Sequence, residues 1–305
     1  TFVVTGYKHE QYIREAIEGA FSQTYSPLEI ILSDDCSTDA TFEIMRAMAR
    51  DYHGPHTVRL NRNEQNLGVA RHVNKSFRMM RGELWIGAAG DDISLPHRTA
   101  QLVQAITDNE EWMAVSSSVE LFGDQTGVCP TAFRNRKLHP LELCIAPPPP
   151  RGCAAAYRRC VFEKFGELES GCIAEDMALS FRAGLLGISG SIPDVLVKYR
   201  ISASSLSLGG NSREDYIRKQ AIRISGFRQN LRDFDRMYPR EDALGAICRA
   251  LLALQVKMQE DLLSENTMRF HLANAYLAAW KGVAKLIALL HFSDWLKRKR
   301  QLGHL

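Results

Sequence analysis

Long apolar stretches, paired cysteine motifs and glycine-rich phosphate loops are all missing from this 305-residue sequence. No run of 18 or more uncharged apolar residues occurs, so no transmembrane helix is expected. The seven cysteines are irregularly spaced and include no Cys-x-x-Cys pair, which favours reduced cytosolic thiols over a zinc site or a disulfide framework. Gly-x-Gly-x-x-Gly, Gly-x-x-x-x-Gly-Lys-Ser/Thr and Gly-x-Ser-x-Gly are also absent. Dinucleotide-binding, P-loop and α/β-hydrolase interpretations therefore find no support.

The charge of the chain is unevenly distributed, although its formal net value is only +3. Residues 211–305 contain 17 Lys and Arg against 10 Asp and Glu, so this third is strongly basic and the remainder is slightly acidic. A basic segment attracts anionic lipid, polyphosphate or nucleic acid. A solvated helical surface explains the same composition, and the charge count alone does not separate the two interpretations.

Apolar residues in the first half alternate between strand-like runs and helical spacing. The expected strands are 2–4, 28–32, 57–60, 84–89 and 112–119, and helices are expected between them. We expect a side chain within 37–39 to cap the second helix, and Pro96 to lie in the first turn of a later one. This alternation predicts an α/β fold in which a mostly parallel sheet is covered by helices.

The second half of the chain predicts a different organisation. Residues 123–152 end in four consecutive prolines, 147–150, and we expect an extended wall or hinge there instead of a strand. Helices are expected at 158–165 and 174–186, and most of 212–300 has helical spacing. Serine and glycine cluster at 205–212, which predicts a domain boundary.

Two pairs of acidic residues directly follow expected strands. Asp34 and Asp35 come after the 28–32 strand, and Asp91 and Asp92 come after the 84–89 strand. Ligands of open α/β sheets bind beyond the carboxyl ends of the strands. Crowded carboxylates repel unless a cation or a donor separates them, and oxygen ligands on a loop suit Mg²⁺ or Mn²⁺. Helix capping or a solvated turn is the alternative interpretation of each pair.

A third acidic pair, Glu175 and Asp176, opens the 174–186 helix. Acids in a first helical turn normally interact with the helix macrodipole, which is the simpler explanation. Arg182 lies six residues beyond Asp176, so no simple helix pair accounts for Asp176. Gly68 opens an earlier helix whose N-terminus favours an anion, and Arg71 lies on its first turn.

Taken in order, these motifs resemble the family 2 glycosyltransferases, over roughly residues 1–205. The similar stretches are Thr5–Tyr7 with Tyr12-Ile13 and Gln23–Tyr25; Leu28–Thr41, which contains Asp-Asp-x-Ser-Thr-Asp; Asn66–Gly68 with Asn74, Gly82-Glu83 and Gly90–Asp92; and Glu175-Asp176 with Arg182. The resemblance implies the GT-A (Rossmann-like) nucleotide-sugar-binding fold. It also implies three parts: a nucleotide-sugar-binding half (1–122), an acceptor-binding and catalytic-base half (123–208), and a helical C-terminal region (209–305).

The resemblance implies roles for five residues at the nucleotide. Thr5 and Tyr7 lie where the family contacts the nucleoside, with Tyr7 able to stack on the base. Asp35 would accept the imide N–H of uracil or thymine. Arg71 would contact phosphate, and Asp91 would face the ribose or sugar of the donor.

The resemblance further implies that Asp92 binds the divalent cation, Mn²⁺ or Mg²⁺, and that Asp176 is the general base. The sequence departs from the family pattern at Ala89, where many members have a further acid, and at Ser202, where many have a histidine. The implied reaction transfers one sugar from a UDP- or dTDP-type donor to a hydroxyl of a glycan or lipid-linked acceptor, with inversion. This is the chemistry of bacterial surface-polysaccharide synthesis.

Two other functions stay open at this point. Nucleotidyl transfer to a sugar phosphate also uses a Rossmann-like sheet and paired acids, but Thr5–His9 is a poor version of its glycine-rich signature. A non-catalytic subunit that binds sugar nucleotides or polysaccharide would keep the fold without needing all three acidic pairs. Release of a nucleoside diphosphate without pyrophosphate would identify glycosyl transfer.

An apolar stripe at Trp280, Val283, Ile287 and Leu290 is followed by a basic cluster, 297–300. An amphipathic helix with tryptophan and basic residues can lie in a membrane interface, so we expect 276–300 to contact an anionic membrane surface. Packing of the stripe on the catalytic domain or on another copy of the chain, as a homo-oligomer, is the alternative. Nucleic acid is not expected as a partner. The expected location is the cytoplasm, at the inner face of the cytoplasmic membrane.

Overall fold

The computed structural model describes the chain except for residues 132–134, 146–151, 203–211, 239–242 and 264–305. The strands are β1 (Phe2–Gly6), β2 (Glu29–Asp34), β3 (Thr57–Arg62), β4 (Leu84–Ala89), β5 (Ile93–Ser94), β6 (Trp112–Gly123), β7 (Gly127–Cys129), β8 (Ala155–Arg158) and β9 (Ile188–Ile201). The helices are α1 (Ile13–Phe21), α2 (Thr41–Arg50), α3 (Val69–Met79), α4 (Arg98–Asp108), α5 (Pro140–Ile145), α6 (Cys160–Glu163), α7 (Glu175–Leu186), α8 (Arg213–Met237) and α9 (Ala243–Leu263), with a 3-10 turn η1 (Gly152–Ala154). The proline run 147–150 and the stripe within 276–300 lie outside the described residues, as does nearly all of the predicted boundary at 205–212.

One nine-stranded sheet runs through the molecule in the order β3-β2-β1-β4-β8-β6-β9-β5, with β7 paired to β6. Strands β3, β2, β1 and β4 are parallel, as are β6 and β9. Strand β8 runs antiparallel to both β4 and β6, and so joins the two parallel sets. The predicted α/β class is therefore confirmed, and the antiparallel pairing of the second half is added to it.

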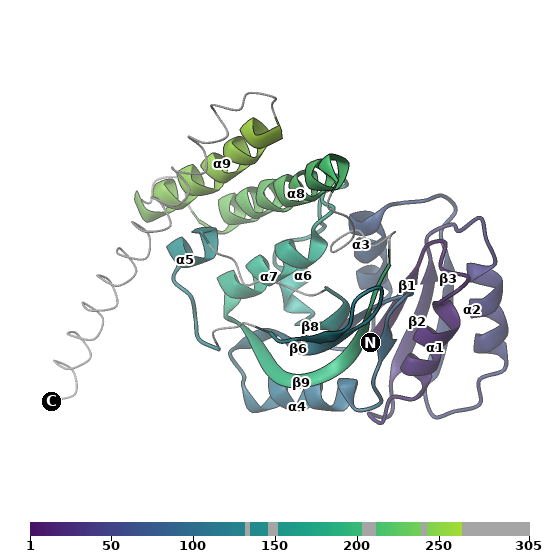
Figure 1. The fold of residues 1–305 in the computed structure, drawn as a ribbon. Helices are drawn as coiled ribbons and strands as arrows, with labels where there is room; N and C mark the ends of the chain where they lie inside the picture. The colour runs from purple at the N-terminus through teal and green to yellow at the C-terminus, as the bar shows by residue number, and fades with distance from the viewer. Residues whose placement is uncertain (132–134, 146–151, 203–211, 239–242, 264–305) are drawn as a thin grey trace, which may run out of the picture.

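Helices cover both faces of the sheet, as Figure 1 shows. Alternate residues of each central strand point to opposite faces. In β1, Phe2 and Val4 pack with α1, α2 and α4, whereas Val3 packs with α3, α6 and α7. Strands buried on both faces explain why the apolar runs in 28–32 and 84–89 show no alternation of polarity.

Three local expectations need correction, and one is refined. The N-cap residue of α2 is Ala40, which has no capping side chain, but Asp39, within the expected 37–39, accepts the N–H of Thr41, the first residue of the helix, at Oδ1 at 3.1 Å. Pro96 precedes the first turn of α4, because that helix begins at Arg98. The helix expected at 158–165 is confined to α6, since Arg158 belongs to β8. Residues 123–152 contain β7, α5 and the start of η1, so the described part of the expected wall is partly regular structure.

The described part of the C-terminal region, α8 and α9, packs on the half of the molecule that carries α7. Figure 1 shows the two helices stacked beyond α6 and α7, away from α4. Apolar side chains of α5, α7, α8 and α9 form one core, which includes Phe181 of α7, Phe234 of α8 and Leu252 of α9. The division at residue 208 stays a prediction about domains, but α8 shares a core with α7.

A buried ion pair joins α7 to α8. Arg182 and Asp233 are both fully buried, and the guanidinium donates from Nε to Oδ2 at 2.7 Å and from Nη2 to Oδ1 at 3.0 Å. Removing one partner of such a pair leaves an uncompensated charge inside the protein. We expect Asp233→Asn to lower the free energy of unfolding by about 3–5 kcal/mol.

Urea unfolding of Asp233→Asn measures this loss. The exposed pair of Arg46 and Glu43 on α2 supplies the matched control, and Glu43→Gln should change the free energy of unfolding by at most about 1 kcal/mol. Equal urea midpoints for Asp233→Asn and the unmodified chain would show that the buried pair adds nothing to stability.

Candidate functional site

The first two acidic pairs meet at one edge of the sheet, where β1, β2 and β4 end. Gly6 of β1 pairs with Asp34 of β2, and Thr5 pairs with Ala89, the last residue of β4. The Asp35 N–H donates to the Gly6 carbonyl at 2.9 Å, which closes the gap between the two strand ends. Parallel pairing thus brings together residues that are more than 50 positions apart in the chain.

The loops that follow β1 and β2 are joined by a hydrogen bond. Lys8 and Cys36 have left-handed backbone conformations, with φ of 57° and 61°, which non-glycine residues adopt mainly where surrounding contacts enforce them. The Lys8 N–H donates to Ser37 Oγ at 2.9 Å. Tyr7 stays 41% exposed at this edge, so its ring is available to stack on a planar ligand.

The carboxylate of Asp35 was predicted to accept a hydrogen bond from the nucleotide base, but in the structure it accepts hydrogen bonds from other residues of the chain. The buried carboxylate accepts hydrogen bonds from Asn63 Nδ2 at 2.7 Å, from the Leu67 N–H at 2.9 Å and from the Gly68 N–H at 3.0 Å. Asp35 therefore holds the 63–68 loop against the end of β2. Its assignment as a base-reading residue stays a prediction.

Asp34 was not among the residues predicted to bind the nucleotide, yet one oxygen of its carboxylate accepts no hydrogen bond among the described residues. Its Oδ2 accepts from the Ser37 N–H at 3.0 Å and faces Arg62 Nε at 3.5 Å. Its Oδ1 is buried and has no hydrogen-bond partner among the described residues. Buried polar atoms normally have partners, so this orphaned oxygen at a strand end is unusual. The pairing of Asp34 with Gly6 across the parallel ladder is the signal that would have found it.

Asp92 is the second acid with an unsatisfied oxygen. It is only 3% exposed, and its Oδ1 accepts the Arg200 N–H at 2.8 Å. Its Oδ2 is buried and accepts no hydrogen bond of ordinary geometry within the described ranges, while the nearby Cys153 thiol interacts with the carboxylate and lowers its pKa. Burial, and then the neighbouring Asp91, raise the pKa of Asp92 to about 8.

These properties of Asp92 fit a divalent cation. A cation at Oδ2 would give the orphaned oxygen a partner and would favour the charged carboxylate that burial disfavours. Among the described residues, no group of three or more His, Cys, Asp and Glu side chains is arranged to hold a metal. Asp92 stays the predicted protein ligand, with phosphate and water supplying further ligands, as is usual for Mg²⁺. Asp91 stays a predicted contact to the ribose or sugar of the donor.

Arg200 of β9 holds the acidic loop in place. Its guanidinium donates from Nε to the Asp91 carbonyl at 2.9 Å and forms an ion pair with Glu15 of α1. The same group lies 4.3 Å from the centres of both the Tyr12 and the Phe122 rings. The sequence analysis drew attention only to Ser202 in this stretch, because the link of Arg200 to Asp91 and Asp92 depends on pairing across the fold.

Asp176 stands at the N-terminus of α7, next to η1. Its Oδ2 accepts from the Gly152 N–H at 3.3 Å, and its Oδ1 accepts from the Met177 N–H at 2.7 Å. A Cβ on Gly152 would lie 3.2 Å from the Asp176 Cβ, so only a small residue fits here. Because Cys153 follows Gly152 and approaches Asp92, η1 connects the third acidic pair to the second.

Both acids of this third pair have raised pKa values. Burial raises the pKa of Asp176, against hydrogen bonds from Met177 and Gly152 that lower it. Burial, and then the charge of Asp176, raise the pKa of Glu175 to about 8. A carboxylate with a raised pKa is a better proton acceptor, so either member of the pair can act as a base. The sequence selected Asp176 alone.

The two predicted basic residues have different surroundings. Arg71 is exposed on the first turn of α3, where a ligand phosphate could reach it. Arg182 does not turn back toward Asp176, since it pairs with Asp233 of α8. Arg71 stays a predicted phosphate contact.

Residues 1–166 match the sequence model of the family described as glycosyl transferase family 2. The chain belongs to this family. The resemblance found in the sequence is thereby confirmed. The matched residues contain β1 to β8 and α1 to α6, and they include Asp34, Asp35, Asp91 and Asp92. Asp176, α8 and α9 lie beyond the match.

Relatives of this family member cover much of its length at low identity. It is 25% identical over 232 residues to an uncharacterized glycosyltransferase of Haemophilus influenzae, which covers 72% of this chain and 71% of that protein. It is 24% identical over 232 residues to one of Nostoc sp., covering 72% and 70% of the two chains. The family and its transferase class are therefore supported by both comparisons.

Solved structures confirm the GT-A type of fold. Residues 1–349 of S. aureus TarS, in complex with UDP-GlcNAc, match with a TM-score of 0.54 at 16% identity, over 86% of this chain and 90% of that one. The mannosyltransferase PcManGT from Pyrobaculum calidifontis, in complex with GDP-Man and Mn²⁺, matches with a TM-score of 0.62 at 20% identity, over 97% and 79%. Within the described ranges of this glycosyltransferase, no helix is both long and apolar enough to span a bilayer.

Proposed function

We propose that this glycosyltransferase moves a sugar from a UDP- or dTDP-sugar to a hydroxyl of a glycan or lipid-linked acceptor, with inversion at the anomeric carbon. The observation that supports this most strongly is the buried, unpartnered Oδ2 of Asp92 at the edge where β1, β2 and β4 end. A diphosphate donor brings the negative charge that a cation held at this oxygen would balance. Attack by a hydroxyl from the opposite face needs one base and no covalent intermediate.

Asp92 would hold Mn²⁺ or Mg²⁺, which would supply charge compensation for the departing nucleoside diphosphate, and Asp91 would face the ribose or sugar of the donor. The chain itself fixes these acids through Arg200, whose N–H reaches Asp92 and whose guanidinium reaches the Asp91 carbonyl. The acidic loop is thus set before a donor binds, and no rearrangement of the loop is needed during transfer.

Asp176 takes the proton of the acceptor hydroxyl in this proposal. Its raised pKa makes the carboxylate a stronger base than an ordinary aspartate, and its hydrogen bonds from Gly152 and Met177 fix its direction. A positioned base contributes roughly 10²–10⁴-fold to rate. Glu175, next to it, is the alternative base.

The nucleoside would bind between Tyr7 and the acids of β2. Tyr7 offers an exposed ring, and Thr5 lies at the end of β1 beside it. The imide N–H of uracil or thymine would donate to a carboxylate at this edge. Asp34 Oδ1 lacks a donor, while Asp35 holds the 63–68 loop beside it.

Thermal-shift measurements with UDP, dTDP and GDP, each with and without Mn²⁺, test this proposal. We expect UDP and dTDP with Mn²⁺ to raise the melting temperature more than GDP does, because a ligand that binds the folded state stabilises it according to its affinity. GDP is the necessary comparison, since one structural neighbour was solved with GDP-Man. A larger shift with GDP would reverse the donor assignment. Release of nucleoside diphosphate from the matching sugar nucleotide would then establish transferase chemistry.

The sequence also predicts two associations of this enzyme, with a membrane surface and with another copy of the chain. Residues 276–300 lie outside the described ranges, and we propose that this basic stretch brings the enzyme to the inner face of the cytoplasmic membrane, where a lipid-linked acceptor would be presented. Flotation with anionic and neutral vesicles measures this association directly, and gel filtration measures homo-oligomer formation.

A further inference from the structure

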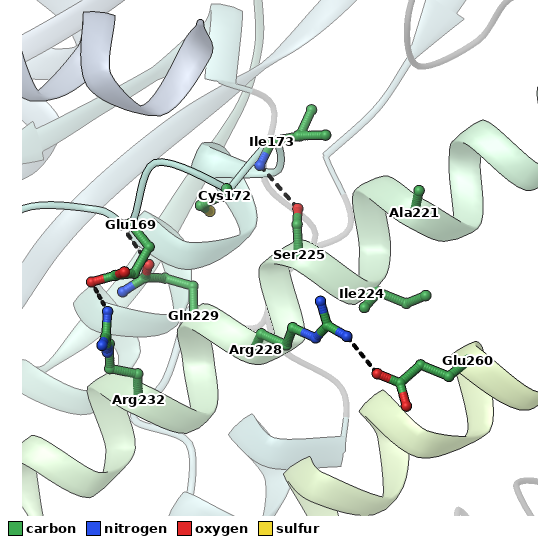
Figure 2. Close-up of a pocket in the computed structure, with 11 residues that line it drawn as sticks. Glu169, Cys172, Ile173, Ala221, Ile224, Ser225, Arg228, Gln229, Arg232 and Glu260 are labelled. Carbon is green, nitrogen blue, oxygen red and sulfur yellow. Dashed lines mark hydrogen bonds and ion pairs between the residues drawn. The ribbon is translucent and has the colours of Figure 1, made fainter. Parts of the chain in front are cut away.

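One face of helix α8 holds the segment that leads into Asp176. Ser225 Oγ accepts the N–H groups of Ile173 at 2.9 Å and of Ala174 at 3.3 Å. One helical turn further on, Gln229 Oε1 accepts the Glu169 N–H at 2.8 Å. Figure 2 shows Ser225 and Gln229 pointing from the same side of α8 toward this segment. We call residues 166–174 the strap.

The strap is also fixed at its start. Asn74 of α3 both donates to the Leu168 carbonyl at 2.8 Å and accepts the Leu168 N–H at 2.9 Å. Arg182 of α7 donates from Nη1 to the Gly166 carbonyl at 2.8 Å, while Asp233 of α8 holds the same guanidinium. The strap therefore runs between α3, α7 and α8 with bonds to each.

Close packing adds to these hydrogen bonds. Gly226 follows Ser225, and a Cβ there would lie 1.9 Å from Met177 Cε and 3.1 Å from Ala174 Cβ. Any larger residue would push on Ala174 and Met177, which flank Glu175 and Asp176. The backbone of α8 at Gly226 thus lies against the side chains of Ala174 and Met177 at the start of α7.

The space between the strap and α8 is only partly filled. A cavity of about 770 Å³ lies there, lined by strap residues, by α8 residues that include Ser225 and Gln229, and by Glu260 of α9. Two ion pairs lie at this cavity, Arg232 with Glu169 and Arg228 with Glu260. Because side chains do not fill this space, the hydrogen bonds of Ser225 and Gln229 are important for keeping the strap in place.

We propose that Ser225, Gly226 and Gln229 of α8 are positioning residues for Asp176: they fix the strap, and through it the direction of the carboxylate toward Gly152. This inference rests on the proposed function, in which Asp176 is the base. The bond from the Gly152 N–H to Asp176 is 3.3 Å long, so a small shift of the first turn of α7 would break it. A misplacement of ~1 Å at a reacting group can cost ~10²-fold in rate.

The test compares Ser225→Ala, Ser225→Thr and Arg228→Ala in the full chain. Turnover is the rate of nucleoside diphosphate release from the best sugar nucleotide with Mn²⁺, and affinity is the Kd of the matching nucleoside diphosphate. We expect Ser225→Ala to lower kcat at least ~10-fold with a Kd unchanged within about two-fold, since it acts on placement and not on donor binding. Ser225→Thr keeps the hydroxyl and should restore most of kcat. Arg228 is 63% exposed at the same cavity, and Arg228→Ala should behave like the unmodified enzyme.

Hydrogen exchange gives a readout that needs no activity. Ser225→Ala should speed exchange of the amides of Ile173 and Ala174, whose acceptor it removes, while the amides of β1 and β2 keep their protection. Gln229→Met should speed exchange at Glu169 in the same way, and it replaces Ser225→Ala should that variant fail to fold. Unchanged exchange in the strap would overturn the inference.

A double-mutant cycle separates the inference from the proposed function. If Ser225 acts through Asp176, Ser225→Ala should lower kcat no further once Asp176→Asn is present. Additive losses, or a rise in Kd together with the fall in kcat, would show a general structural role and overturn the positioning role. An Asp176→Asn enzyme with normal kcat would instead contradict the proposed base. If Ser225→Ala has a normal kcat while Asp176→Asn is inactive, the positioning role of Ser225 would be contradicted and the proposed base would not.

Discussion

Replacing Asp92 with alanine should lower Mn²⁺-dependent turnover by ~10²–10³-fold, the usual cost of losing a group that stabilises charge in the transition state. The same change should weaken binding of the nucleoside diphosphate in the presence of Mn²⁺. Asp92 lies at the carboxyl end of β4, and its Oδ2 is buried without a hydrogen-bond partner in the part of the chain that the structure describes. Affinity in the absence of Mn²⁺ should change much less, because only the cation-mediated part of binding is lost.

Asp92→Asn distinguishes the charge of this side chain from its shape. Asparagine can still accept the Arg200 N–H at Oδ1, so the acidic loop should keep its place while the charge is removed. Asp108, exposed near the end of α4, provides the matched control, and Asp108→Asn should leave turnover and its Mn²⁺ dependence unchanged. An Asp92→Ala enzyme that turns over normally with Mn²⁺ would contradict the assignment of the metal to this residue.

Local sequence was sufficient to place Asp91 and Asp92 at the carboxyl edge of the sheet. The apolar run of β4 ends in Ala89, and a buried parallel strand of this kind delivers whatever follows it to the carboxyl edge of the sheet. The choice between Asp34 and Asp35 was beyond local sequence. It depends on the 63–68 loop, which supplies donors to Asp35 from about 30 residues away and leaves Asp34 Oδ1 without one.

The second half of the sheet was harder to predict for a different reason. Strand β9 spans Ile188–Ile201 and pairs along its length with β6, some 75 residues earlier in the chain. Strand β8 has only four residues and sits between β4 and β6. Neither shows enough periodicity to be separated from loop or helix by pattern alone, because long-range pairing stabilises it.

The packing of α8 against the rest of the protein was difficult to predict because the buried face of this helix is polar. Gln220, Gln229, Asn230 and Asp233 are all buried on this helix, so apolar periodicity, the main signal for a packed helix, underestimates its contact surface. Asp233 meets Arg182 across 51 positions of the chain. The sequence therefore suggested a separable helical region where the structure has a helix bonded to the strap before Asp176.

Asp176→Asn should leave folding and nucleotide affinity nearly intact and should lower turnover by at least ~10²-fold, the scale of a lost general base. The amide keeps the shape of the side chain and can still accept the short bond from the Met177 N–H, so only the weaker Gly152 contact is lost with the proton acceptor. The base works as the carboxylate, and burial raises its pKa. Activity of the unmodified enzyme should therefore fall with decreasing pH at a higher pH than an ordinary aspartate, with a pKa of about 4, would give.

Glu175→Gln is the comparison that decides between the two neighbouring acids. Both lie in the first turn of α7, but the Asp176 carboxylate is also held from outside this turn, by the Gly152 N–H, whereas the backbone hydrogen bonds described for Glu175 come from its own turn. We therefore expect Glu175→Gln to keep most of the turnover. The acidic limb of its pH–rate profile should stay where the unmodified enzyme has it, because Glu175, whose pKa is raised to about 8 by burial and by the charge of Asp176, is neutral in the pH range where Asp176 loses its proton. Loss of turnover in Glu175→Gln beside normal turnover in Asp176→Asn would transfer the role of base to Glu175 and leave Asp176 as its neighbour.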